Sequence, residues 1–412
     1  MPGDGPHMST RSAAVLTACF CTVFTMFAIR LSYGVLLPEM LPSLGITKTE
    51  AGVIYSLYFI AYTVFSPVLG LLADRISIRV LLCLFSVVLG IGTFFMAYSS
   101  SLVEASLFFL LTGIGASAGW SPVVALAQRW VSDKRRGLTL GVIDAGGSLG
   151  VAMSSLAMPL IVVAHNWRMG WKILGVSAFL VAAMNFFLVR SRPAGQPDLR
   201  HPTLSQHRNE PVTRIYARLL TDIRFWLIGL SYLLIGFSAL IPTTFLSTYA
   251  VEELTLRYSV ATRLMTIMYL AAIGGKLILG PLSDAVGRIR ILMMCNTLIA
   301  GASLAIAYSH GFPTLHLFSA LFGFGYGGIF PLYAACASDY FSKDAVGGIV
   351  GLWTLCLGVG FILSPVIAGW TADATGTLGW SFVLATVIGM TSVFLLVLAR
   401  KALSVGHWPR NQ

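Results

Sequence analysis

The sequence predicts an all-α integral membrane protein in which twelve transmembrane helices form two pseudo-symmetric six-helix bundles. Three observations lead to this fold class. Hydrophobic residues make up 57% of the 412 positions and charged residues only 10%, whereas a soluble chain needs a larger polar fraction to cover its core. The apolar residues gather in twelve long runs. The second half of the chain also repeats motifs of the first half at a constant separation.

Each apolar run supplies the roughly 20 residues with which an α-helix crosses a bilayer. Backbone polar groups in lipid must be hydrogen-bonded within their own segment, so a run that spans the membrane alone is helical. We expect the twelve helices near residues 13–38, 50–73, 79–98, 103–129, 138–163, 171–190, 224–249, 258–282, 290–309, 314–338, 346–370 and 379–400.

The basic residues indicate membrane topology rather than nucleic-acid binding. The formal net charge is +11, but the Lys and Arg residues concentrate in alternate loops, as the positive-inside rule predicts. Both termini are then cytoplasmic, in a multi-pass protein of a bacterial-type cytoplasmic (inner) membrane, and residues 1–12 are not a separate cleavable signal. The short cytoplasmic loops carry Arg75, Arg79, Lys134, Arg135, Arg136, Arg288, Arg290, Lys343, Arg400 and Lys401, against Lys48, Arg168, Lys172, Arg257 and Arg263 on the other side.

The sequence indicates neither cofactor chemistry nor ATP hydrolysis. The six cysteines lie in apolar runs and form no C-x-x-C pair, which is typical of small buried side chains. No G-x-x-x-x-G-K-[ST] motif and no Ser/His or paired-carboxylate arrangement occurs. We therefore expect no cofactor, no metal ion and no catalytic residue, and energy from a proton or substrate gradient.

The chain divides at residues 191–222, a polar stretch rich in Pro that we interpret as a cytoplasmic linker. Residues 1–190 and 223–412 are then the two six-helix bundles. The second run is followed by GLLADRISIR and the eighth by GPLSDAVGRIR, which places Gly70 and Gly280 210 residues apart. The pairs Gly113/Gly115 and Gly323/Gly325 share this separation. Repeats at one offset indicate two copies of an ancestral unit.

These motifs resemble the major facilitator superfamily across nearly the whole chain. The loop after the second run is similar to the family's Gly-x-x-x-Asp-Arg-x-Gly-Arg-Arg signature, with Ser77 and Ile78 at positions where glycine and a basic residue are usual. The copy after the eighth run keeps Gly287 and Arg288 but has Ala285 in place of the first arginine. The resemblance implies transport by alternating access, and a monomer.

We interpret the two signature copies as a cytoplasmic latch that holds one state and releases another. The glycines are expected to let neighbouring helix backbones approach, and the aspartates to pair with loop arginines or to face a helix N-terminus. A static topological anchor is the alternative. The latch residues are Gly70, Asp74, Arg75, Arg79, Arg136, Gly280, Asp284 and Arg288.

Three ionisable residues lie deep in the apolar runs: Arg30, Asp144 and Lys276. An arginine near a helix centre costs about 2.5–3.5 kcal/mol on insertion scales, which favours a polar cavity over lipid. Arg30 shares a helix face with Tyr33, and Lys276 with Tyr269, at helical spacing. The alternative for Arg30 is that it snorkels to the outer surface.

The segment from Gly275 to Gly280 is similar to the eighth span of monocarboxylate and oxalate/formate-type transporters. The resemblance implies that the basic residue there binds the substrate carboxylate, but this chain has Lys276 where arginine is usual, and so lacks the bidentate fork. Arg30 resembles the first-span arginine of organophosphate and organic-anion members. Because the fifth and eighth spans of this family meet, Asp144 and Lys276 are expected to form an interdomain ion pair that gates transport or couples it to protons; a constitutive buried pair is the alternative.

The remaining candidates for the substrate cavity are aromatic. Tyr58 and Tyr62 lie one turn apart on the second run, Trp120 and Pro122 interrupt the fourth, and Tyr326 and Pro331 interrupt the tenth. Trp353 belongs to the eleventh run. Core packing is the alternative for each residue taken alone. The predicted substrate-binding set is Arg30, Tyr33, Tyr62, Trp120, Tyr269, Lys276, Tyr326 and Trp353.

The predicted function is secondary transport of a small organic anion, with a monocarboxylate as the leading substrate and either proton co-transport or exchange as the mechanism. The expected partners are this anion, protons and the lipid bilayer, without nucleic acid. A proton-driven exporter of lipophilic drugs or metabolites is the first alternative, although Arg30 and Lys276 would repel cationic drugs. A non-transporting membrane sensor on the same fold is the second, and a membrane-embedded enzyme the third.

Overall fold

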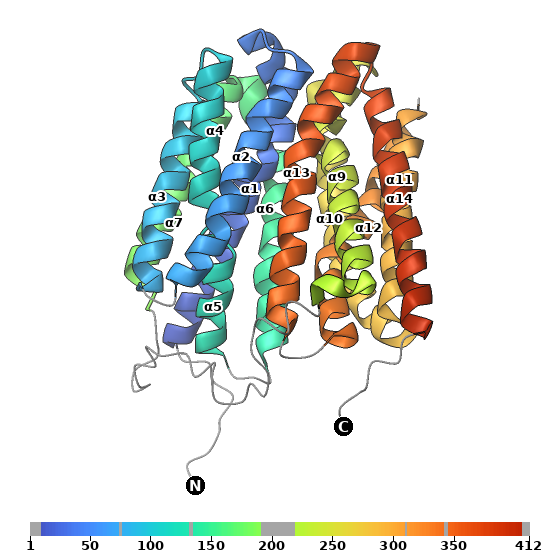
Figure 1. The fold of residues 1–412 in the computed structure, drawn as a ribbon. Coiled ribbons are helices and arrows are strands. Elements are labelled where there is room, and N and C mark those ends of the chain that lie inside the picture. Colours follow the sequence, from blue (N-terminus) through green and yellow to red (C-terminus); the bar gives the residue numbers. More distant parts are fainter. Residues whose placement is uncertain are drawn as a thin grey trace. The chain divides into compact units, whose positions relative to one another are not determined.

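A computed structural model describes residues 10–73, 76–131, 135–190, 219–309, 311–341 and 345–405 (Figure 1). Its described segments contain helices and no strands, and twelve spans are long and apolar enough to cross a membrane, which confirms the predicted fold class. The helices are α1 (Thr10–Leu44), α2 (Lys48–Leu72), α3 (Ile78–Met96), α4 (Leu102–Ala116), α5 (Ser121–Trp130), α6 (Arg136–Ala164), α7 (Trp167–Leu188), α9 (Ile223–Glu252), α10 (Tyr258–Val286), α11 (Arg288–Ala307), α12 (Phe312–Tyr340), α13 (Val346–Thr375) and α14 (Gly379–Val405).

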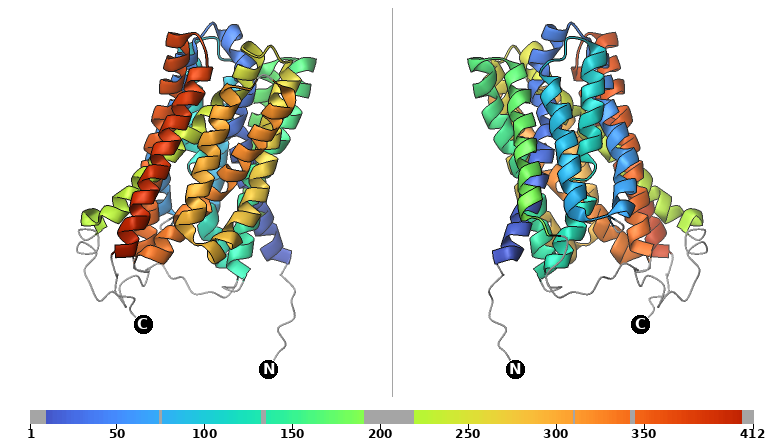
Figure 2. Two further views of the ribbon diagram at one scale, coloured as in Figure 1. Left: turned by 90° about the vertical axis from the view of Figure 1, so that its right-hand side faces the viewer. Right: turned by 90° about the vertical axis from the view of Figure 1, so that its left-hand side faces the viewer.

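The contacts group the chain into two compact units. The first comprises Met1–Ser32 and Leu57–His201, and the second comprises Tyr33–Ser56 and Pro202–Gln412. The hairpin formed by the end of α1 and the start of α2 therefore packs with helices of the second half of the chain. Within the first unit α3 lies beside α7, and within the second α11 lies beside α14 (Figure 2).

The internal repeat is visible in the packing of the glycines. A Cβ at Gly113 of α4 would lie 3.0 Å from the carbonyl carbon of Tyr58 in α2. A Cβ at Gly323 of α12 would lie 2.6 Å from the carbonyl carbon of Met268 in α10. Tyr58 and Met268, like the two glycines, are 210 positions apart. The same pair of backbones thus meets at the same residues in each unit, at distances that only glycine permits.

Each unit also buries an asparagine that joins three helices. In the first, Asn185 Nδ2 donates to Thr22 Oγ1 (3.1 Å) and Ser86 Oγ (3.3 Å). In the second, Asn296 Nδ2 donates to Ser392 Oγ (2.8 Å) and Tyr333 Oη (3.2 Å). Because a buried amide without partners is costly, these bonds fix how the helices are rotated against one another.

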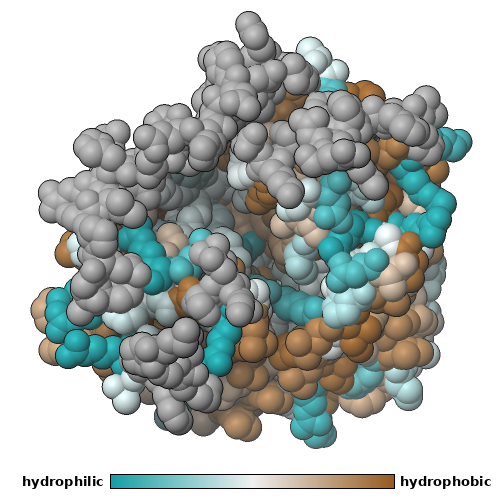
Figure 3. All heavy atoms as spheres, turned by 90° about the horizontal axis from the view of Figure 1, so that it is seen from below, coloured by the Kyte–Doolittle hydropathy of each residue, from teal (hydrophilic) through white to brown (hydrophobic). Residues whose placement is uncertain are grey.

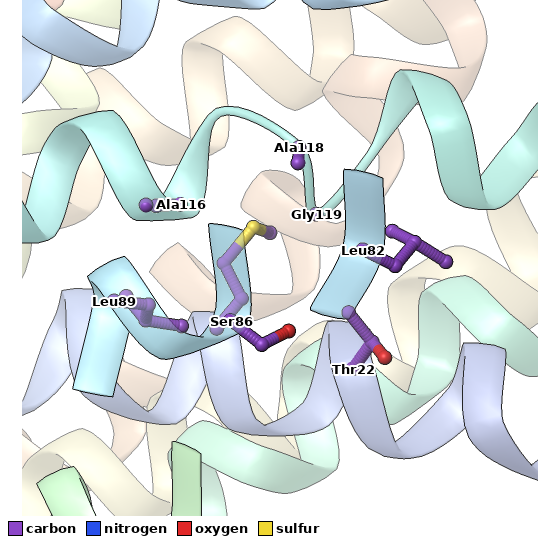
Figure 4. A pocket seen from close by; sticks show the side chains of 9 residues that line it. Thr22, Leu82, Ser86, Leu89, Ala116, Ala118 and Gly119 are labelled. Atoms are coloured by element: carbon purple, nitrogen blue, oxygen red, sulfur yellow. The ribbon is translucent and has the colours of Figure 1, made fainter. Parts of the chain in front are cut away.

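The fourth span is broken and its counterpart is not. Residues Ser117–Trp120 separate α4 from α5, as Trp120 and Pro122 predict, and the break borders a cavity of about 10 Å³ that Thr22 and Ser86 also line (Figure 4). This volume is near the lower limit for one water molecule. The predicted interruption of the tenth span is wrong, since α12 runs through Pro331 to Tyr340. Proline is tolerated inside spans where neighbouring helices compensate for the lost bond.

The outer surfaces of the helices suit a lipid environment. Large apolar side chains such as Leu160, Val163 and Phe187 are more than two-thirds exposed. Figure 3 views the molecule from one end, where hydrophilic residues gather and hydrophobic residues lie along part of the rim. Together with the twelve spans, this distribution identifies an integral multi-pass membrane protein.

Candidate substrate and gating site

Arg30 lies in an aromatic box inside the first unit. Its guanidinium carbon is 4.6 Å from the ring centroid of Phe59, and 5.6 Å from those of Phe27 and Tyr62. The residue is only 6% exposed, so its charge does not lie on the lipid-facing surface. A cation over aromatic faces gains about 0.5–2 kcal/mol per contact, which offsets part of the cost of burial.

The walls of this box are fixed by packing. Phe27 precedes Arg30 by one turn of α1. Its ring packs against Gly147 of α6, where an added Cβ would lie only 2.9 Å from Phe27 Cδ2. Gly146 and Gly150 likewise pack α6 against Phe20 and Phe24 of α1. On α2, Tyr62 stacks on Tyr58 with the ring centroids 6.3 Å apart.

This arrangement suits a carboxylate. Guanidinium N–H groups donate in the plane of the group, in a geometry that matches the two oxygens of a carboxylate. Bonds from a guanidinium to a carboxylate are strengthened in a buried, low-dielectric setting. Phe59 was not among the predicted residues, because its sequence context alone does not distinguish it from an ordinary lipid-facing or core phenylalanine.

Tyr33 lies in the second unit. Its hydroxyl donates to the carbonyl oxygen of Ala51 (2.7 Å), and its ring stacks on Tyr55 with centroids 4.7 Å apart. The hydroxyl thereby closes the α1–α2 hairpin. A contact between Tyr33 and substrate stays a prediction.

The second unit brings Tyr269 and Tyr326 together. Tyr269 of α10 and Tyr326 of α12 meet edge to face with centroids 6.2 Å apart. Lys276 follows Tyr269 by two turns and is half-buried. Trp353 is buried elsewhere in this unit: its indole N–H donates to the carbonyl oxygen of Phe225 (3.0 Å) and its ring packs where Gly229 leaves space. That environment is one of helix packing.

Two further predicted residues belong to the first unit. Trp120 is the residue before α5, half-buried at the break in the fourth span. Asp144 is half-buried on α6. Pairing of Asp144 with Lys276 stays a prediction.

The latch residues are partly described. Arg288 forms an ion pair with Asp284, donates from Nε to Asp339 Oδ2 (3.0 Å), and donates from Nη1 to Ser283 Oγ (2.6 Å). Asp339 was not among the predicted latch residues. In the first copy, Arg79 lies over the Phe186 ring at 4.6 Å.

The expected close approach at the latch glycines is wrong. A Cβ at Gly280 would meet no described atom within 4 Å, and one at Gly70 would meet Ser121 Cβ at an ordinary 3.9 Å. The helix crossings that need glycine lie deeper, at Gly113 and Gly323. Asp74, Arg75 and the side chain of Arg136 lie outside the described residues, as does most of the predicted linker.

Sequence reasoning missed a polar clasp that holds the α1–α2 hairpin within the second unit. The carboxylate of Asp373 on α13 accepts the backbone N–H groups of Lys48 (3.2 Å) and Thr49 (2.8 Å) and so caps the first turn of α2. Lys48 Nζ pairs with Glu252 (2.9 Å) of α9. Ser56 Oγ donates to Ile362 O (2.6 Å). Nothing in the spacing of these residues signals their contact.

Comparison with known proteins gives the family. The family model of the Major Facilitator Superfamily matches residues 18–264 and 228–411. A hexuronate transporter of Bacillus subtilis (strain 168) is 23% identical, covering 86% of this chain and 87% of that protein. Monocarboxylate transporter 12 of Xenopus laevis is 24% identical, covering 84% and 78%. The membrane sensor protein UhpC of Escherichia coli (strain K12) is 25% identical, covering 89% and 87%.

A solved structure shows the same fold. The inward-facing, unoccupied bacterial homologue of the human lysosomal transporter Spinster superposes with a TM-score of 0.83 at 16% identity, covering 98% of this chain and all of that one. The resemblance to monocarboxylate-type members is also confirmed by the transporter 12 relatives. With its twelve spans, its two repeated units and a family match over nearly its full length, the chain belongs to the major facilitator superfamily, whose members are transporters of small molecules rather than enzymes.

Proposed function

We propose that this protein is a secondary transporter that moves a small organic anion, with a monocarboxylate as the leading substrate, by alternating access. The observation that carries the proposal is the buried Arg30 in its box of Phe27, Phe59 and Tyr62. A guanidinium binds a carboxylate through charge-assisted, often paired hydrogen bonds, so Arg30 is suited to bind the carboxylate of the substrate.

The names of two relatives support a monoanion as the substrate. A hexuronate and a monocarboxylate, the substrates in the names of two relatives, each carry one carboxylate. Lys276 is the second anion-binding residue in this proposal. Asp144 gates the site or carries the coupling proton, and exchange of one carboxylate for another is the alternative energy source.

The proposed setting is a bacterial-type inner membrane, with both termini cytoplasmic and the chain acting as a monomer. The distribution of Lys and Arg supports this topology. The Asp284–Arg288–Asp339 cluster acts here as part of the cytoplasmic latch.

One relative favours a second candidate function. UhpC is named a membrane sensor, and a sensor on this fold would bind an anion at the same box without moving it. Binding and transport therefore have to be measured separately.

The first experiment is a thermal-unfolding screen of the purified protein. The ligands are lactate, pyruvate, oxalate, acetate, a sugar acid, a sugar phosphate, a neutral sugar and a lipophilic cation. A ligand at 100 times its dissociation constant stabilises the native state by about 2.7 kcal/mol. We expect one carboxylate to raise the unfolding midpoint, and Arg30→Gln to weaken its binding about 10–100-fold, as loss of a charged hydrogen bond does.

The control is Arg263→Gln, which removes an exposed cation from α10 and should keep the full shift. The active ligand then enters flux assays in proteoliposomes. Uptake against a gradient supports the transporter, and binding without flux supports the sensor. A shift produced by the lipophilic cation alone, unchanged in Arg30→Gln, contradicts the anion site and favours the drug exporter.

A further inference from the structure

The start of α7 carries two cations where helix electrostatics disfavours them. Arg168 lies in the first turn and Lys172 one turn later, so the two share a helix face, and the first turn contains no acidic residue. Like charges at this spacing repel each other. Cations near a helix N-terminus also oppose the macrodipole. An anion bound at this end of the helix would offset both the repulsion between the two cations and their repulsion by the macrodipole.

Neighbouring aromatic and backbone groups hold the two cations in place. The Arg168 guanidinium lies 4.4 Å from the Trp167 ring centroid, and its Nη2 donates to the carbonyl oxygen of Ser99 (3.2 Å). Lys172 Nζ lies 4.8 Å from the ring centroid of Tyr98. Both side chains therefore reach the segment between α3 and α4, and two positive charges gather over one short stretch of surface.

An unsatisfied donor lies in the same place. Trp167 is 3% exposed, and its indole N–H has no hydrogen-bond acceptor among the described residues. Buried donors of this kind are rare in proteins, and this one belongs to the residue on whose ring the Arg168 guanidinium lies. Glu104, near the start of α4, is engaged locally, since its Oε2 accepts from the Ser100 backbone N–H (2.8 Å) and Oγ (2.9 Å).

An apolar stripe continues from the cations along α7. Val176 and Leu180 follow Lys172 at intervals of four residues and are 46% and 66% exposed. On the adjacent α3, Phe95 is also exposed, as is Tyr98 just beyond the end of that helix. Tyrosine and tryptophan are typical of the boundary between headgroups and acyl chains. The surface thus offers positive charge at the boundary and apolar contact below it, which matches a ligand with an anionic head and a hydrocarbon tail.

We propose that Tyr98, Trp167, Arg168 and Lys172 form a binding site for the phosphodiester headgroup of an anionic phospholipid, whose acyl chain lies along Val176 and Leu180. The phosphate oxygens accept hydrogen bonds from Arg168 and Lys172 and lie within the field of the α7 N-terminus. By the predicted topology, this is the leaflet opposite the cytoplasm, where the chain otherwise carries few cations. The site is separate from the Arg30 box and does not depend on the substrate proposed for it.

The test is native mass spectrometry of the detergent-purified protein titrated with phosphatidylglycerol or phosphatidylcholine. The wild type should prefer phosphatidylglycerol, and the double variant Arg168→Gln/Lys172→Gln should bind it about 25-fold more weakly, at about fivefold for each cation near a membrane surface. Phosphatidylcholine binding should not change. Arg168→Lys/Lys172→Arg, which keeps both charges, should retain most of the preference.

The matched control is Arg257→Gln/Arg263→Gln, which removes two exposed cations at the start of α10. It should bind phosphatidylglycerol as the wild type does. Equal losses in the two double variants would overturn the site, because they would reflect net charge alone. Displacement of phosphatidylglycerol by inorganic phosphate, with no contribution from the acyl chain, would overturn it in favour of a free-anion site. A thermal-unfolding midpoint within the range of the control shows that the variant is folded.

Discussion

Substitution of Gly323 by alanine should separate α10 from α12 and destabilise the second unit. The new Cβ would lie 2.6 Å from the carbonyl carbon of Met268 and 2.9 Å from its Cα. Carbon atoms pack at about 3.5–4.0 Å, so the two backbones would have to move apart by roughly 1 Å. The clash is with backbone on both sides, and no side-chain rotation relieves it.

The expected loss of unfolding free energy follows from two opposing contributions. Overpacking of a tight contact costs about 1–3 kcal/mol or more, and a backbone-to-backbone clash belongs at the upper end. Replacing a helical glycine by alanine returns about 0.5–1 kcal/mol. We therefore expect Gly323→Ala to lose about 2 kcal/mol, which on the scale of domains of 150–250 residues lowers the unfolding midpoint by about 4–8 °C.

The assay is thermal unfolding in detergent, with Gly301→Ala as the control. Gly301 lies inside α11, and a Cβ there would meet no described atom within 4 Å. This variant should be as stable as the wild type or slightly more stable. Gly113→Ala, whose Cβ would lie 3.0 Å from the carbonyl carbon of Tyr58, should lose less than Gly323→Ala. A Gly323→Ala protein as stable as Gly301→Ala would refute the assignment of this contact as the tightest crossing of the repeat.

Three further substitutions test other parts of the molecule. Asp373→Asn removes the charge that caps α2, a change of about 1 kcal/mol, and amide hydrogen exchange at Lys48 and Thr49 should accelerate about fivefold; an unchanged rate would show that the cap is dispensable. Asn296→Leu leaves the hydroxyls of its network without their donor and should cost about 1–3 kcal/mol in thermal unfolding, whereas a neutral result would mean that the network does not stabilise the unit. Asp144→Asn should impair flux in proteoliposomes or abolish its pH dependence; unchanged transport at every pH would exclude the residue from gating and proton coupling.

The fold was predictable because lipid makes backbone hydrogen bonding and hydropathy decisive. Twelve apolar runs and one repeated loop sufficed, and the spans agree with the helices. The interruption at Trp120 was also readable, whereas the same inference failed at Pro331. A proline removes one backbone bond in either case, and whether the helix then breaks depends on the neighbours that replace it, which the local sequence does not contain.

The site was predictable only in part. Arg30 was evident as a charge that lipid cannot accommodate, and Phe27 lies one turn away on the same helix. Phe59 comes from another helix, so spacing along α1 cannot find it. Tyr33 shares a helix face with Arg30 in the sequence, yet its hydroxyl is bonded to Ala51. Periodicity assigns residues to helix faces, but it does not say which helix covers each face. For this reason the predicted close approach of helix backbones at Gly70 and Gly280 was wrong.

The packing of Gly34 bears on how the two halves diverged. A Cβ on this residue would lie 3.2 Å from the Cα of Thr244, which is the residue 210 positions later and thus its own counterpart in the repeat. In a dimer of single repeats, before fusion into one chain, this contact would have joined two identical residues, and any added bulk would have entered it twice. In one fused chain, one copy can carry the larger threonine as long as the other is glycine. The contact between Gly34 and Thr244 therefore joins two different residues, which is possible in one fused chain but not at the symmetry axis of a homodimer.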